Sequence, residues 1–128
     1  MGKRKLFTIK DLEILIKKHL MTKTSWALKA LDRIYALQET VEKESKQSIF
    51  DNSVGFTRFD APILTKLAHR HRYGRVLSDN EIRFIQNVIP KYWKQILGIT
   101  GREKMELYFK EKGILHEMQS TPRETGLL

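Results

Sequence analysis

Cysteine is absent from the 128-residue chain, which excludes disulfides and thiolate metal ligands. The absence is compatible with a reducing cytosol, and we expect a cytoplasmic protein. Long apolar runs are missing as well: none approaches the roughly 18 residues that a membrane-spanning helix needs. Charged residues interrupt the apolar positions of residues 1–20, so this basic start is not expected to be a signal peptide. We expect no association with a membrane.

Motifs of catalysis are also missing. The chain contains no G-x-S-x-G, no glycine-rich phosphate loop and no H-E-x-x-H. Its acidic residues cluster at 39–44 and 103–111, on helix faces predicted to be solvated, instead of pairing in an apolar setting. We therefore expect a protein that is not an enzyme and that needs no cofactor. A catalytic site assembled only in space is the least supported alternative.

The stretch "LAHRHRYGRVLSDNE", residues 67–81, is the densest group of histidine and arginine. His69 and His71 are two positions apart, so on a helix they point about 200° away from each other. One ion cannot bind both, and cysteine is not there to complete a site. The sequence therefore predicts no metal site, and His71 is expected at the edge of the core.

Positive charge is what the sequence does contain, with a formal net charge of +9. Lys and Arg outnumber acids by six to two in residues 1–20 and by eight to three in 58–98. The balance is five to five in both 21–57 and 99–128. A basic excess attracts nucleic acid first, anionic membranes second and acidic proteins third, although solubility alone is a sufficient explanation.

Hydrophobic periodicity of three and four residues predicts an all-α protein, a compact bundle of about five helices. We expect the helices at about 9–20, 24–46, 61–73, 79–97 and 101–112. The expected organisation is a basic amphipathic N-terminal helix or arm (1–20), a helical core domain (21–113) and a flexible C-terminal tail (114–128). The arm is expected to dock on its own chain, on a second subunit or on a partner.

Caps and breakers set the expected helix ends. The predicted N-caps are Thr8, Asp60, Ser78 with Glu81, and Thr100 with Glu103, and the predicted C-terminal glycines are Gly74 and Gly113.

Two interruptions carry further predictions. Pro90 should kink the helix at 79–97 while lying opposite its apolar stripe. The stretch "IFDNSVGFTRF", residues 49–59, contains helix breakers but is too apolar for a free linker. It predicts a packed loop whose aromatic residues, Phe56 and Phe59 among them, fill the core.

Two neighbouring basic helix faces form the predicted binding site. Arginine suits phosphate because its planar fork donates two hydrogen bonds at once. Such a face contacts the phosphate backbone rather than base sequence. Tyr73 and Trp93 are candidates for stacking on a base, with the core as the alternative for Trp93. A second, looser contact is expected from the N-terminal "KRK" with Lys17 and Lys18. The predicted nucleic-acid-binding residues are Lys66, Arg70, Arg72, Arg75, Arg83, Lys91 and Lys94.

The stretch "LAHRHRYGRVLSDNEIRFI", a helix, a turn with glycine and a capped helix, also resembles a helix–turn–helix motif. Its connection, "YGRVLSD", is longer than the 3–4 residues usual in that motif. Base-specific binding in the major groove is therefore a weaker alternative.

Residues 25–97 resemble an uncharacterised helical module of phage proteins that also flanks bacterial and phage helicase-like proteins. The resemblance rests on "IYALQET", on Asn52 followed by "GFTRFDAPILTKLA", on "GRVLS" and on "KYWKQIL". This chain departs from the pattern at "SV" before Gly55 and at "DNE" after Ser78. The resemblance implies a phage or mobile-element protein of the host cytoplasm that acts around DNA or RNA processing, and it brings no catalytic residues.

These observations favour a small non-enzymatic nucleic-acid-binding accessory protein that contacts the phosphate backbone. The alternative is a phage protein-interaction module, an inhibitor or adaptor, that binds a host or phage protein complex. The sequence leaves open DNA or RNA, the number of strands, and the oligomeric state.

Overall fold

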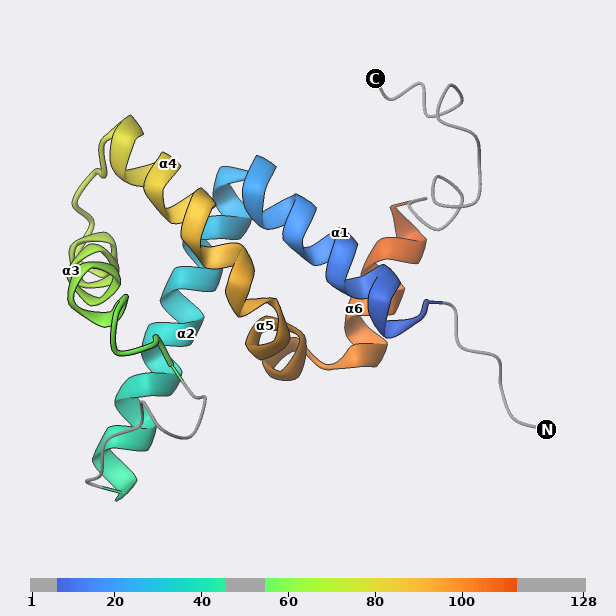
Figure 1. The fold of residues 1–128 in the computed structure, drawn as a ribbon, viewed down its shortest axis with the longest axis horizontal. Coiled ribbons are helices and arrows are strands. Elements are labelled where there is room, and N and C mark those ends of the chain that lie inside the picture. The colour runs from blue at the N-terminus through green and yellow to red at the C-terminus, as the bar shows by residue number, and fades with distance from the viewer. Residues whose placement is uncertain (1–6, 46–54, 113–128) are drawn as a thin grey trace.

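The protein is described by a computed structural model that covers residues 7–45 and 55–112, without the side chains of 41–45. These residues form helices and no strand, which confirms the predicted all-α fold (Figure 1). The predicted tail at 114–128 and the "KRK" at residues 3–5 lie outside the described residues. No helix in the described ranges is both long and apolar enough to cross a membrane. In chain order the elements are α1 (Ile9–Thr22), α2 (Thr24–Ser45), α3 (Ala61–Arg72), α4 (Asp79–Val88), the 3-10 turn η2 (Ile89–Tyr92), α5 (Trp93–Thr100) and α6 (Arg102–Glu111).

The long helix α2 is the centre of the packing. Ala27, Leu31 and Ile34 recur along one side of it and are fully buried. It contacts α1, α3, α4, η2 and α5. In Figure 1 the path from α4 through η2 to α5 crosses α2, with α3 to one side and α1 and α6 to the other.

Helix α1 belongs to this core. Thr8 is the N-cap as predicted, and with Asp11 it forms a capping box in which each side chain accepts the other's backbone N–H at 3.0 Å. Leu12, Ile16 and Leu20 are fully buried. The helix predicted as an arm therefore packs on its own chain, and it continues to Thr22, past the predicted end at residue 20.

The two ends of the described chain are joined through α6. The rings of Phe7 and Phe109 meet edge to face with centroids 6.1 Å apart. The Arg102 guanidinium also donates a hydrogen bond to the Phe7 carbonyl at 2.6 Å. These contacts tie the residues before α1 to the last helix.

The predicted helix at 79–97 is divided rather than continuous. Ser78 and Glu81 form the predicted capping box of α4, but the α-helix ends at Val88. Pro90 has no N–H to donate, so a 3-10 turn takes over at this point before α5 begins. The prediction that Pro90 lies opposite the apolar stripe is wrong, because Pro90 is buried with Ile89 and Tyr92.

The segment before α3 is held by side chains from other elements. Gly55 has the left-handed φ of 83° that the sequence predicts for a turn. The Gln38 side chain accepts the Phe56 N–H at 3.0 Å, and Gln95 bonds both the N–H and the carbonyl of Gly55 at 2.9 Å. Phe56 is fully buried as predicted, whereas Phe59 is 89% exposed, so its predicted place in the core is wrong.

Two predicted caps are also wrong. Asp60 stands at the N-cap position of α3, but its side chain makes no capping bond because other groups bind it. Thr100 is the last residue of α5, and α6 begins after Gly101, whose φ of 97° breaks the helix. Gly74 follows the end of α3 with a φ of 78°, as predicted. Gly113 lies outside the described residues.

The burial of α1 predicts a large difference between two isoleucines on the same helix. Ile16 is fully buried and Ile14 is 45% exposed. Ile16→Ala should lower the free energy of unfolding by about 2–5 kcal/mol, because it leaves a cavity in the core. Ile14→Ala is the matched control and should cost less than about 1 kcal/mol. Equal effects in urea unfolding would show that α1 is not part of the core in solution.

Candidate nucleic-acid interface

Three of the seven predicted binding residues are paired with acids of their own chain. Arg70 of α3 forms an ion pair with Glu81 of α4. Arg72 bonds Glu39 of α2 at 2.9 Å, and its guanidinium lies over the Tyr35 ring. Because these charges are already compensated, they attract a phosphate less than their number suggests.

The third paired residue is Lys91, whose ammonium lies 2.6 Å from the nearly buried carboxylate of Asp60. The Tyr92 hydroxyl donates to the same carboxylate at 2.6 Å and accepts the Thr57 N–H at 2.9 Å. Burial raises the pKa of Asp60, but the bonds from Lys91 and Tyr92 outweigh this effect and lower it overall. Burial and the neighbouring Asp60 raise the pKa of Tyr92 to about 12. Lys91 therefore stabilises the entry to α3.

The other four predicted residues, Lys66, Arg75, Arg83 and Lys94, are exposed and form no ion pair within the described ranges. Lys66 lines the groove between α3 and α4. Lys94 instead lies toward α1, where it joins Lys17 and Lys10 in lowering the pKa of Glu13. The hydrogen bond from Lys17 is the largest of these causes. Lys66 and Arg70 thus line the α3/α4 groove. Arg72 instead faces α2, and Lys94 lies near Glu13 of α1.

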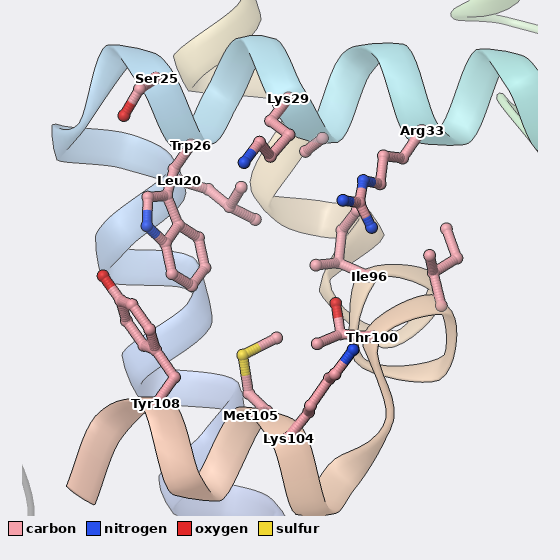
Figure 2. A pocket seen from close by; sticks show the side chains of 12 residues that line it. Leu20, Ser25, Trp26, Lys29, Arg33, Ile96, Thr100, Lys104, Met105 and Tyr108 are labelled. Atoms are coloured by element: carbon pink, nitrogen blue, oxygen red, sulfur yellow. The ribbon is translucent and has the colours of Figure 1, made fainter. Parts of the chain in front are cut away.

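A cavity of about 580 Å³ lies between α2, α5 and α6, and Leu20 of α1 closes its base (Figure 2). Its apolar lining includes Ala30, Ile96 and Met105. The rings of Trp26 and Tyr108 stand at one end of it. The volume is within the range of about 300–1,000 Å³ that is usual for small-ligand sites.

Three basic side chains converge on this cavity. Lys29 and Arg33 extend from α2 and Lys104 extends from α6 toward them (Figure 2). No acidic residue lines the cavity, and no ion pair or hydrogen bond joins these three side chains to any other described residue. The cavity therefore gathers three cationic side chains that have no ion-pair partner among the described residues.

Two acids on the described part of α2, Asp32 and Glu39, have partners on α3. Asp32 lies 3.5 Å from His71 of α3, and Glu39 pairs with Arg72. Asp32 and Arg33 line a second pocket together, so the acids and cations of α2 are neighbours around the helix. Neither Asp32 nor Glu39 lines the cavity, so a segment with balanced charge still contributes two cations and no acid to the described lining.

A sum of charge along the chain does not reveal this cavity. Residues 21–57 and 99–128 each balance to zero, although Lys29, Arg33 and Lys104 come from them. Helical spacing was the signal that would have found it. Trp26, Lys29 and Arg33 recur at steps of three and four, so they share one face of α2.

The stacking and histidine predictions can be placed directly. Tyr73 is exposed beside His69, and Trp93 is half-buried against the core. His71 turns to Asp32 at the edge of the core, away from the His69 side. Among the described residues no group of three His, Asp or Glu is placed to hold a metal ion.

Comparison of the chain with family models, with curated proteins and with solved structures found no match. Assignment of a function therefore rests on the geometry and the charge of the molecule itself.

The Asp60 pair predicts a pH-dependent effect of Lys91. Lys91→Ala should lower the free energy of unfolding at pH 7 by about 1 kcal/mol, since the lysine is half exposed. A lowered carboxyl pKa gives stability that is present above the unfolded pKa of about 3.9 and is lost as the pH falls. The difference between variant and wild type should therefore shrink below about pH 4. Lys94→Ala, which removes an exposed lysine without this partner, is the control and should change little at either pH.

Proposed function

We propose that the protein is a non-enzymatic nucleic-acid-binding accessory protein that contacts phosphate groups through its basic side chains. The observation that carries this proposal is the convergence of Lys29, Arg33 and Lys104 on one cavity without an acid. Three like charges held close together repel one another, and a bound phosphate relieves that repulsion.

The distribution of the remaining charge favours a long anion over a small one. Uncompensated cations lie in the cavity, and Lys66, Arg75, Arg83 and Lys94 lie exposed elsewhere. A polynucleotide supplies phosphates at regular intervals and can follow such scattered cations, whereas a single small anion cannot. Arg70, Arg72 and Lys91 have to exchange an acid partner for a phosphate, so we assign them the smaller contributions.

The biological setting of the proposal comes from the resemblance of residues 25–97 to the phage module. In that setting the protein acts in the cytoplasm of the host, on the DNA or RNA of a phage or mobile element. The setting implies no membrane contact and no cofactor.

The proposal predicts strongly salt-dependent binding of both DNA and RNA oligonucleotides. Each phosphate contact contributes a slope of about −0.9 for duplex or −0.7 for single strands in a plot of log affinity against log salt. Replacing Lys29, Arg33 and Lys104 by alanine should reduce the magnitude of the slope by about 2–3. Fluorescence anisotropy at four or five salt concentrations measures it.

A second triple variant, in which Lys66, Arg75 and Arg83 become alanine, removes the same number of charges and is the matched control. If the cavity is the principal contact, the first variant weakens binding more than the second. A larger loss of affinity in the second variant would instead show that the principal nucleic-acid contact lies on α3, α4 and the turn between them, as the sequence predicts. A slope near zero in the wild-type protein would contradict nucleic-acid binding altogether.

One observation favours the alternative, a protein-interaction module. The groove between α3 and α4, about 500 Å³ in volume, is bordered by Pro62, Ile63 and Phe84 together with Lys66 and Arg70. Ile63 is 51% exposed and Phe84 is 37% exposed, and exposed apolar side chains that lie together often mark a binding surface.

In this alternative an inhibitor or adaptor uses the groove to bind a host or phage protein complex. Ile63→Ser with Phe84→Ser should then abolish nuclease-resistant capture of a partner while nucleic-acid affinity is unchanged. Capture that disappears on nuclease treatment, or that survives both substitutions, would contradict a role for the groove.

A further inference from the structure

The cavity between α2, α5 and α6 has two chemically different ends. Figure 2 shows the rings of Trp26 and Tyr108 at one end, and Arg33 and Lys104 approaching each other toward the opposite end. Lys29 extends into the space between them. A ligand that satisfies both ends has to carry a flat apolar group and an anionic group a short distance apart.

The aromatic end is held in place by the core behind it. The Trp26 ring lies 4.7 Å from the His19 ring and is nearly parallel to Phe109, with an interplanar angle of 18°. Its centroid is 5.6 Å from that of Tyr108, and the two planes are inclined by 56°. Inclined rings do not sandwich a base between them. They allow a base to stack on one ring while its edge meets the other.

Arg33 and Lys104 form the charged end, and Lys29 lies between this end and the two rings. Lys29 and Arg33 are four residues apart on one face of α2, and Lys104 faces them from α6. The hydroxyls of Ser25 and Thr100 also line the cavity and can hydrogen-bond a base edge or a sugar. A nucleotide joins a base to a phosphate over one sugar, which matches the succession of these groups along the cavity.

We propose that this cavity binds a nucleotide with an unpaired base, with the base against Trp26 and Tyr108 and its phosphate at Lys29, Arg33 and Lys104. This inference rests on the proposed nucleic-acid binding and narrows the proposed ligand to single-stranded nucleic acid. In a duplex the neighbouring bases cover both faces of each base and the partner strand covers its edge, so the aromatic end cannot be used. Stacking tolerates any base, so sequence preference is weak.

Intrinsic fluorescence tests the proposal because the chain contains two tryptophans. Trp93→Phe leaves Trp26 as the reporter, and Trp26→Phe leaves Trp93, which does not line the cavity. The ligands are a 12-nucleotide single-stranded DNA, the same sequence as RNA, the duplex DNA, and nucleoside monophosphates. Single strands should quench Trp26 but not Trp93, and should bind at least tenfold more tightly than the duplex.

Tyr108→Leu tests the stacking contribution independently. Loss of one base–aromatic stack should weaken single-strand binding about 5- to 100-fold and leave duplex binding unchanged. Phe59→Leu, which removes an exposed ring that does not line the cavity, is the control. Far-ultraviolet circular dichroism verifies that each variant is folded.

The outcomes separate this inference from the proposed function. Equal affinity for single strand and duplex, no quenching of Trp26 and no effect of Tyr108→Leu would overturn the inference, while a steep salt slope would leave nucleic-acid binding in place. Nucleoside monophosphates could instead bind as tightly as the oligonucleotides, with the same dependence on Tyr108. That result would overturn the proposal that the bound nucleotide belongs to a nucleic-acid strand, and the ligand would then be a free nucleotide. Absence of all binding at low salt would overturn both proposals.

Discussion

Burial of the apolar side of α2 is the interaction on which the rest of the structure depends. Ala27, Leu31 and Ile34 lose all contact with water only because α1, α3, α4, η2 and α5 approach the same helix. Each neighbour occupies part of its circumference and thereby decides which of its polar residues remain open. Lys29 and Arg33 stay uncovered because they face the space that α5 and α6 enclose without filling. The candidate site is thus a consequence of how the core forms.

The sequence predicts the helices well and their junctions poorly. Periodic apolar residues, the Thr8 N-cap and the Ser78 capping box are local signals, and they appear in the structure as predicted. Asp60 also has a local signal for a cap, but Tyr92 and Lys91 reach it from far along the chain and replace the capping bond. Phe56 and Phe59 are both phenylalanines of the same short segment before α3. Local sequence does not distinguish them, and only tertiary packing decides that Phe56 is buried and Phe59 exposed.

The difference between local signals and tertiary contacts also explains which candidate site residues the sequence identifies and which it misses. Counting charge along the chain emphasised residues 58–98, where Arg70, Arg72 and Lys91 then proved to have acid partners on other elements. Ion pairs between distant segments are invisible to such a count, as is the convergence of two segments that are each neutral overall. What the sequence does contain is the position of each charge around its helix. That information predicts that Lys29 and Arg33 share one face of α2. It does not predict that α6 brings Lys104 to the same cavity.

The contact of Arg102 and Phe109 with Phe7 has a consequence for the topology of the chain. The beginning of α1 and the end of α6 are already neighbours, so the order in which the helices follow one another is not what brings them together. A short peptide joining these two ends, with the chain opened at the exposed turn after Gly74, is therefore compatible with the described packing of the core. The segment that precedes the first helix and the last described helix are in this sense joined, although α6 is not among the helices that pack closely along α2.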